Sequence, residues 1–193
     1  MQINSRYNFT RRIYDQNYYS QNYFSRNNDN QSNNKSMVGA RILGEQLAPN
    51  INGIVTFQEV TGGTLVTATI YGLPDYQPAQ NGQAPVGPFG FHIHEHGNCS
   101  INDSNNAFAL TGGHWNPTNQ PHGNHAGDLP VLFSNHGFSQ MTFFTDRFLP
   151  EDVLGKAVII HQNPDDYRTE PAGNSGKRIA CGVIEYIQVS NNL

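Results

Sequence analysis

The sequence predicts an all-β fold, a β-sandwich or barrel with long metal-binding loops, preceded by a disordered N-terminal tail. Seven short segments are rich in β-branched and aromatic residues, which are the residue types enriched in strands. Glycine and proline separate these segments, and no long amphipathic helix is visible. Many short strands joined by such turns are typical of sandwiches and barrels. The expected strands span residues 38–42, 54–60, 64–71, 89–94, 137–144, 157–161 and 179–187.

Turn residues mark the borders of these strands in order along the chain. Gly62 and Gly63 separate the second strand from the third, and Gly87 and Pro88 precede the fourth. One short turn is expected over residues 150–154, between the fifth strand and the sixth. The long segment after the fourth strand is left as a loop, where functional residues commonly lie on a rigid scaffold.

Residues 1–37 are expected to form the disordered tail, and residues 38–193 the folded domain. The tail is rich in Asn, Ser, Gln and Tyr and has too little apolar surface to offset chain entropy. Amide and aromatic residues alternate in it, a composition prone to association. We expect it either to associate with another protein or a surface layer, or to be a solvated extension without a partner.

Charge and composition restrict the classes of partner. Five basic and two acidic residues give the tail a net charge of +3, and the total of −4 therefore leaves −7 on the domain. Two adjacent arginines in the tail are too little to predict nucleic-acid binding. No apolar run reaches membrane-spanning length, and we see no secretory signal, so the compartment is left open. The two cysteines, Cys99 and Cys181, are a free pair or one disulfide.

The fourth strand carries the most informative residues, His92 and His94 on either side of Ile93. Successive side chains of a strand point to opposite faces, so both imidazoles project from one face. They form half of a transition-metal site, because imidazole binds zinc, copper, iron and nickel. For this pattern alone, the alternative is two polar residues on the wet face of a half-buried strand.

Later residues complete two ligand sets that share one histidine. A tight loop of evenly spaced side chains would give zinc four nitrogen and oxygen ligands: His114, His122, His125 and Asp128. An all-imidazole set would suit copper: His92, His94, His114 and His161. His114 belongs to both, since an imidazole ring has two nitrogens and can bridge two metals. His96 and His136 are read as surface residues.

These residues make the chain resemble the copper/zinc superoxide dismutase family, and its bacterial branch in particular, because Cys99 follows the His-x-His strand closely. The resemblance covers roughly residues 38–187. It rests on the motifs at residues 90–95, 113–117, 125–129, 161–166 and 173–183. It implies an immunoglobulin-like Greek-key sandwich and the dismutation of superoxide to oxygen and hydrogen peroxide at a histidine-bridged copper/zinc site.

The resemblance also implies a role for each matching residue. The two ligand sets would hold copper and zinc as given above, and His114 would carry a proton during turnover. Asp165 would hydrogen-bond His92 and His122, fixing one ligand of each metal. Arg178 would bind superoxide beside copper. Cys99 and Cys181 would form the disulfide.

Some features differ from the family pattern and keep alternatives open. His122 and His125 are only three residues apart, where many relatives have a longer insertion. A copper store or carrier, a zinc hydrolase, and a structural component of a surface layer are the rival functions. Arg178 and Asp165 argue against a store, which needs neither. The oligomeric state is open, and a homodimer is one alternative.

Overall fold

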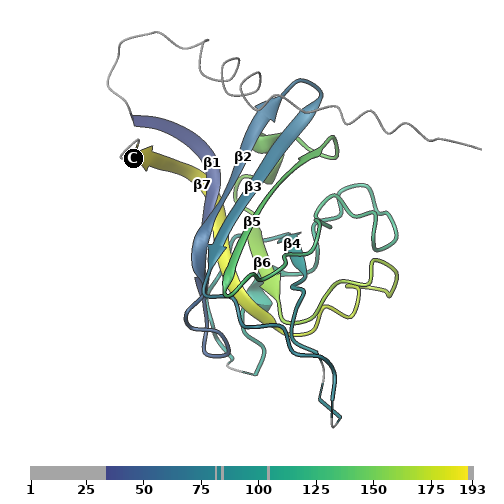
Figure 1. The fold of residues 1–193 in the computed structure, drawn as a ribbon. Coiled ribbons are helices and arrows are strands. Elements are labelled where there is room, and N and C mark those ends of the chain that lie inside the picture. The colour runs from purple at the N-terminus through teal and green to yellow at the C-terminus, as the bar shows by residue number, and fades with distance from the viewer. Residues whose placement is uncertain (1–33, 81, 84, 104, 191–193) are drawn as a thin grey trace, which may run out of the picture. The chain divides into compact units, whose positions relative to one another are not determined.

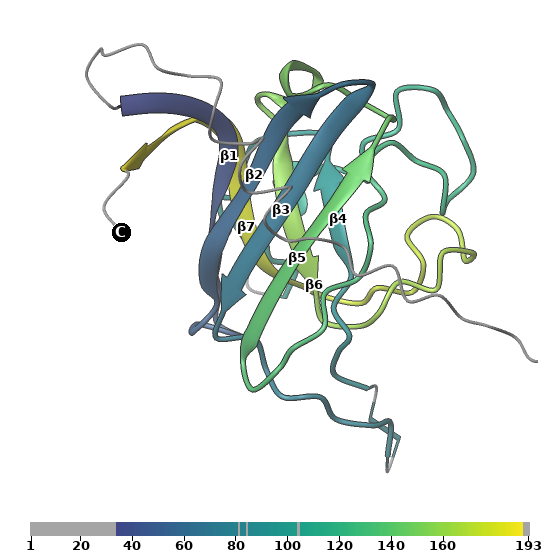
Figure 2. The ribbon, with the colours of Figure 1, turned by 45° about the horizontal axis from the view of Figure 1, so that its top comes forward.

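The structure is a computed structural model that describes residues 34–190, except residues 81, 84 and 104. Seven strands form one antiparallel sheet in the order β4-β6-β7-β1-β2-β3-β5. Their bounds are β1 (Asn34–Gly44), β2 (Asn52–Val60), β3 (Gly63–Tyr71), β4 (Phe91–His94), β5 (Phe138–Thr145), β6 (Ala157–His161) and β7 (Arg178–Ser190). The sheet curls on itself, with β2, β3 and β5 on one side and β4 and β6 on the other (Figures 1 and 2).

The all-β class predicted from the sequence is confirmed, and each of the seven expected strands is present. Within the described part of the chain the helical elements are two short 3-10 turns, η1 (Ala109–Thr111) and η2 (Pro150–Val153). The second of these is the turn expected over residues 150–154. Neither these turns nor any other helix of the described residues is long and apolar enough to cross a membrane.

Alternation of side chains across the sheet builds the core. In β3, Val66, Ala68 and Ile70 are fully buried and the residues between them are partly exposed. Strands β4 and β6 are buried along their whole length, as expected of strands covered on both faces. Loops therefore cover the outer face of this half of the sheet, and the histidines lie beneath them.

The first strand is longer than the sequence predicted. β1 begins at Asn34 instead of residue 38, and it pairs there with the end of β7, from Met37 opposite Ile187 to Asn34 opposite Ser190. Four residues assigned to the tail, three of them polar, are therefore part of the sheet, because backbone pairing with β7 needs no apolar side chains. The rest of the expected tail, residues 1–33, lies outside the described residues.

Two loops place functional residues against the covered face of β4. One connects β4 to β5 and the other connects β6 to β7, and they lie side by side in both views (Figures 1 and 2). The first loop also runs along the free edge of β4, where Leu132 bridges Phe89 and Asp128 bridges His92. The edge strand β4 is thus covered by the chain's own loop.

Candidate metal centre

Strand geometry sets the direction of the histidines on β4 and β6. Phe91 and Ile93 of β4 point into the hydrophobic core, so His92 and His94 point to the opposite face. β6 lies next to β4, and its last residue, His161, follows a register shift in its pairing with β7. All three imidazoles are buried, which is uncommon for histidine and indicates a specific role.

The loop after β4 brings the remaining ligands to the same place. His114 forms a β-bridge with His94, and Asp128 forms one with His92. Backbone hydrogen bonds from Trp115 to Ile93 and from Ile93 to Gly127 fix the loop against the strand. The structure therefore collects all seven predicted ligands in two buried groups that share His114: His92, His94, His114 and His161, and His114, His122, His125 and Asp128.

The all-histidine group presents nitrogen lone pairs to a common point. His94 Nδ1 lies 3.0 Å from the carbonyl of Gly112, and His161 Nδ1 lies 3.3 Å from that of Gly176. Because a carbonyl only accepts, each Nδ1 carries the proton, and in a neutral ring each Nε2 keeps a lone pair. These two Nε2 atoms face each other at 3.2 Å. Two lone pairs at that distance repel unless a cation lies between them.

Burial keeps these rings neutral, as a metal ligand requires. Desolvation is the largest influence on each, and it lowers the pKa of His92 to about 4 although the hydrogen bond to Asp165 opposes it. Burial also lowers the pKa of His94 and His161 well below the usual value, and the neighbouring histidines add to this effect. The rings are therefore poor proton acceptors and good ligands at neutral pH.

The second group is arranged around one carboxylate oxygen. Asp128 Oδ1 lies 2.8 Å from His114 Nδ1 and 3.3 Å from His125 Nδ1. Its other oxygen accepts hydrogen bonds from the backbone N–H groups of Gly123 and His125. Burial opposes ionisation, but the His114 hydrogen bond and the nearby histidines outweigh it and lower the pKa of Asp128 to about 2. A charged carboxylate beside three imidazoles is a donor set that zinc prefers.

Buried ring nitrogens without partners test whether the two groups fit metal ions. Among the described residues, His92 Nδ1, His114 Nε2, His122 Nδ1 and His125 Nδ1 are buried and make no hydrogen bond. Buried polar atoms are nearly always satisfied. Each of these atoms belongs to a residue of one or both of the two groups. The residues present therefore fit two metal ions.

Asp165 connects the two groups. Its Oδ2 lies 2.7 Å from His92 Nε2, and its Oδ1 lies 2.9 Å from His122 Nε2. Each ring thereby donates its Nε2–H to Asp165 and leaves its Nδ1 without a hydrogen-bond partner. This is the usual arrangement around ligating histidines. Gly173 approaches this bridge so closely that a Cβ atom on it would overlap Asp165 Oδ1.

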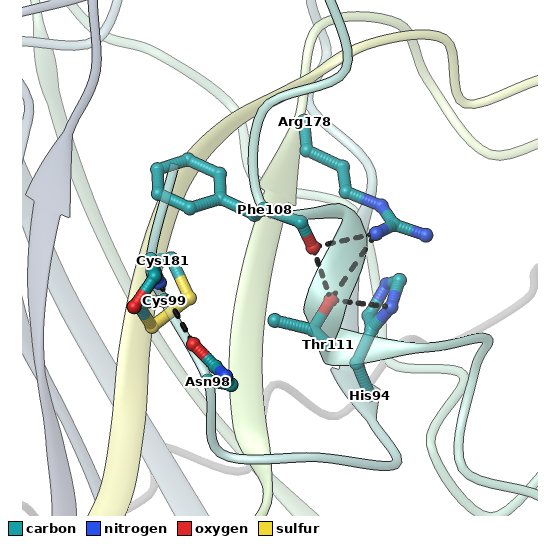
Figure 3. Close-up of a disulfide and its surroundings, with 8 residues drawn as sticks. His94, Asn98, Cys99, Phe108, Thr111, Arg178 and Cys181 are labelled. Carbon is teal, nitrogen blue, oxygen red and sulfur yellow. Dashed lines mark hydrogen bonds between the residues drawn. A yellow bond between two sulfur atoms is a disulfide. The ribbon is translucent and has the colours of Figure 1, made fainter. Parts of the chain in front are cut away.

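Arg178 lies near His94 of the all-histidine group, with the Phe108 carbonyl directed at its guanidinium (Figure 3). Its Nη1 donates to the carbonyl of Phe108 at 2.7 Å and its Nη2 to that of Gly112 at 2.8 Å. Thr111 Oγ1 lies 3.3 Å from both Arg178 Nη1 and His94 Nδ1. The half-buried guanidinium is therefore a fixed positive charge next to a ligand histidine, in a cleft of about 800 Å³ that His161 and Lys177 also line.

A disulfide anchors the loop that supplies these carbonyls. Cys99 of the loop is bonded to Cys181 of β7, with 5.7 Å between their Cα atoms, which confirms the expected pairing. Phe108 packs against the disulfide, and its carbonyl points to Arg178 (Figure 3). The same short segment thus joins the disulfide to the arginine.

Sequence reasoning missed the groups that orient the predicted residues. The carbonyls of Phe108, Gly112 and Gly176 carry no side-chain signal, because any residue type offers a carbonyl. Arg147 and Glu170, whose side chains hydrogen-bond the backbone of the second ligand group, were likewise missed. Their separation in sequence from the groups they touch hides them from spacing arguments. His96 and His136 are exposed, as expected.

Known proteins of one kind match this chain. Residues 51–184 match the family model described as copper/zinc superoxide dismutase. A Cu-Zn superoxide dismutase of Deinococcus radiodurans is 35% identical over 71% of this chain and 79% of its own length. One of Legionella pneumophila is 37% identical over 69% and 77%. The Cu/Zn superoxide dismutase structure of Brucella abortus is 26% identical with a TM-score of 0.62, over 78% of this chain and 100% of that one.

Proposed function

The chain belongs to the copper/zinc superoxide dismutase family, and from that premise we propose how its residues share the work. Its activity is the dismutation of superoxide to oxygen and hydrogen peroxide, with copper and zinc as cofactors. In our proposal copper takes the all-histidine set and zinc takes the set with Asp128. One observation carries this division: the two nitrogens of His114 lie in different buried sets.

The cofactors define what the residues must do. When bound, copper supplies one-electron oxidation and reduction, and zinc polarises the ring that the two sites share. Arg178 then binds the superoxide anion, because its charge is held in place by carbonyls and needs no rearrangement. Lys177 lines the same cleft and adds positive charge at its mouth.

Proton delivery is assigned to His114. The product needs two protons, and His114 Nε2 is a buried nitrogen without a hydrogen-bond partner on the all-histidine side. Its other nitrogen, Nδ1, lies 2.8 Å from Asp128 Oδ1, and the low pKa of Asp128 keeps that carboxylate charged beside the ring. Nε2 can therefore hold one of these protons close to the reacting anion and release it to the reduced substrate, and solvent water supplies the other. Asp165 keeps the neighbouring rings in position throughout.

Metal analysis together with a dismutation assay tests the proposal. The full chain, loaded with both ions and freed of excess metal, should retain about one copper and one zinc per chain, as two sets of four donors predict. Copper bound to the histidines should also give a visible absorption band. Retention of zinc alone after copper loading would contradict the assignment of copper to the all-histidine set and the activity that depends on copper.

Two partner proposals go beyond the superoxide substrate. We propose that the polar, tyrosine-containing segment before β1 associates with another protein or a surface layer, on the support of its composition.

We also propose a homodimer, supported by the exposed apolar side chains Leu43 and Ile101, which line one hollow beside the disulfide. Sedimentation of the full chain over a range of concentrations tests the dimer, and a monomer at every concentration would exclude it.

A further inference from the structure

We propose that Arg147 is a positioning residue for the zinc ligands, acting on His125 and Asp128 through their backbone carbonyls. The inference rests on the proposed function, because it concerns one of the two ligand sets. Arg147 contacts none of the ring nitrogens or carboxylate oxygens that would bind the ion. Its role is to hold the backbone from which two of the four ligands project.

The contacts of Arg147 converge on one short turn. Its Nη1 donates to the carbonyl of His125 at 3.0 Å and to that of Asp128 at 3.3 Å. Its Nη2 lies 3.4 Å from Asn124 Oδ1. A guanidinium is planar and carries its donors in a fixed fork, so it can hold several acceptors in one relative geometry. A single lysine ammonium has no such fork.

Arg147 itself projects from a rigid part of the sheet. It lies two residues after the end of β5, and its N–H donates to Thr145 Oγ1 at 3.2 Å. The next residue, Phe148, is buried, and its carbonyl accepts the Thr64 hydroxyl at 2.7 Å. Phe148 also packs against Trp115, at the start of the ligand loop, with 5.8 Å between ring centroids. The guanidinium is therefore attached to the framework of β3 and β5.

Other supports of the ligand loop have a different origin. Glu170 accepts the His122 N–H at 2.8 Å, and the Tyr167 hydroxyl donates to the Leu129 carbonyl at 3.1 Å. Both side chains lie on the loop between β6 and β7, the loop that also carries Asp165. Arg147 reaches the ligands from the opposite half of the sheet. It thus links them to the strands independently of that loop.

The compact spacing of these ligands makes such a link useful. The turn from His125 to Asp128 is closed by an N–H to carbonyl hydrogen bond of 3.2 Å, and it places His125 Nδ1 3.3 Å from Asp128 Oδ1. Holding both carbonyls restricts rotation of this turn, so the donor atoms keep their arrangement before an ion arrives. Preorganisation of this kind raises affinity by lowering the ordering cost of binding. Without Arg147 the two carbonyls can accept hydrogen bonds from water instead. We therefore expect removal of Arg147 to lower mainly the affinity for metal.

The test uses the full chain and its Arg147→Met and Arg147→Lys variants, with Arg41→Met as the matched control. Arg41 is an exposed arginine that also donates to a carbonyl, that of Gln188, but on the sheet away from the ligands. Zinc affinity is measured by competition with a chromogenic chelator, and copper affinity separately. Cobalt(II) placed in the zinc set reports its geometry through visible absorption.

We expect Arg147→Met to lower zinc affinity by about tenfold or more, in the range found for residues that orient metal ligands. Copper affinity should change by less than about threefold, and the cobalt bands should weaken or shift. Arg147→Lys keeps the positive charge but not the planar fork of donors, so its zinc affinity should lie between those of the unaltered chain and Arg147→Met. The control should match the unaltered chain.

Two results would overturn the inference. One is a zinc affinity of Arg147→Met equal to that of the control. The other is an equal loss of zinc and copper affinity accompanied by a lower unfolding temperature of the metal-free protein, because that pattern marks a general structural role. Failure of the unaltered chain to bind zinc would instead contradict the ligand set itself, and with it this inference, so the two failures are distinguishable.

Discussion

At the scale of single residues, the proposal gives His114 the central place, because it is the residue that belongs to both candidate ligand sets. We expect His114→Ala to reduce dismutation and to lower zinc content, since one ligand is lost from each set. His136→Asn is a suitable control, because His136 is exposed and asparagine tolerates its positive φ of 54°. Metal content and turnover are measured on the same samples. Full turnover with unchanged metal content in His114→Ala would contradict the proposal that His114 is shared by the two metals.

Gly173 gives a second test at this scale. Its φ is +62°, and a Cβ atom there would overlap Asp165 Oδ1 and crowd His122 Nε2. We expect Gly173→Ala to displace Asp165 and lower metal affinity by about 10- to 100-fold. Gly62→Ala is the matched control, because Gly62 also has a positive φ, +86°, but a Cβ there meets nothing within 4 Å. Equal metal affinity in the two variants would show that Asp165 does not orient the ligands.

At the scale of elements, the disulfide holds the segment that positions Arg178. It closes a sequence separation of 82 residues, which in the chain-entropy model is worth on the order of 4 kcal/mol. We expect Cys99→Ala combined with Cys181→Ala to lower the denaturant midpoint and to reduce activity more than copper content, because Phe108 loses its packing partner. Titration of the unreduced, denatured protein should find no free thiol, and two thiols would contradict the bond.

The strands were predictable because β-branched and aromatic side chains mark them, as in β3 and β6. The clustering of the candidate ligands was predictable because the spacing of their imidazole and carboxylate groups is characteristic. What escaped prediction depends on backbone atoms. The first three residues of β1 are polar and pair with β7 through backbone N–H and C=O groups, and the carbonyls that hold Arg178 belong to Phe108 and Gly112. Neither has a signature in side-chain chemistry.

At the scale of the whole molecule, the net charge is the reason why we assign capture of the substrate to Arg178. The chain has a net charge of −4 and the substrate is an anion, so the average field repels it. We expect Arg178→Glu to lower the second-order rate by at least about tenfold with copper content unchanged, while Arg41→Glu, with the same change in net charge outside the cleft, has a much smaller effect. Stopped-flow measurement of superoxide decay gives both rates.

The same steering should depend on ionic strength. The rate of the unaltered protein should fall as salt rises, because salt screens exposed charges beyond about 10 Å at 0.1 M. Equal rates for Arg178→Glu and Arg41→Glu would mean that capture does not run through the anchored arginine.

Truncation tests which N-terminal residues the metal-binding unit needs. Removal of residues 1–33 should leave metal content and specific activity unchanged, because the ligand residues lie in the unit that begins at Asn34. Removal of residues 1–37 should lower the unfolding temperature, since it deletes the pairs from Asn34–Ser190 to Met37–Ile187. Similar unfolding temperatures for the two truncations would show that these pairs add no stability. A shorter chain that fractionates like the full one would count against the association proposed for the tail.

The loop along β4 has a further consequence for the behaviour of the protein in concentrated solution. Asp128 and His114 bridge His92 and His94 along the edge of β4, and both are proposed zinc ligands. A bare strand edge is a template on which other chains add strands and aggregate. If loss of zinc loosens this loop, the edge becomes available, and the metal-free protein should self-associate more readily than the loaded one. Bound zinc would then reduce aggregation in addition to its part in turnover.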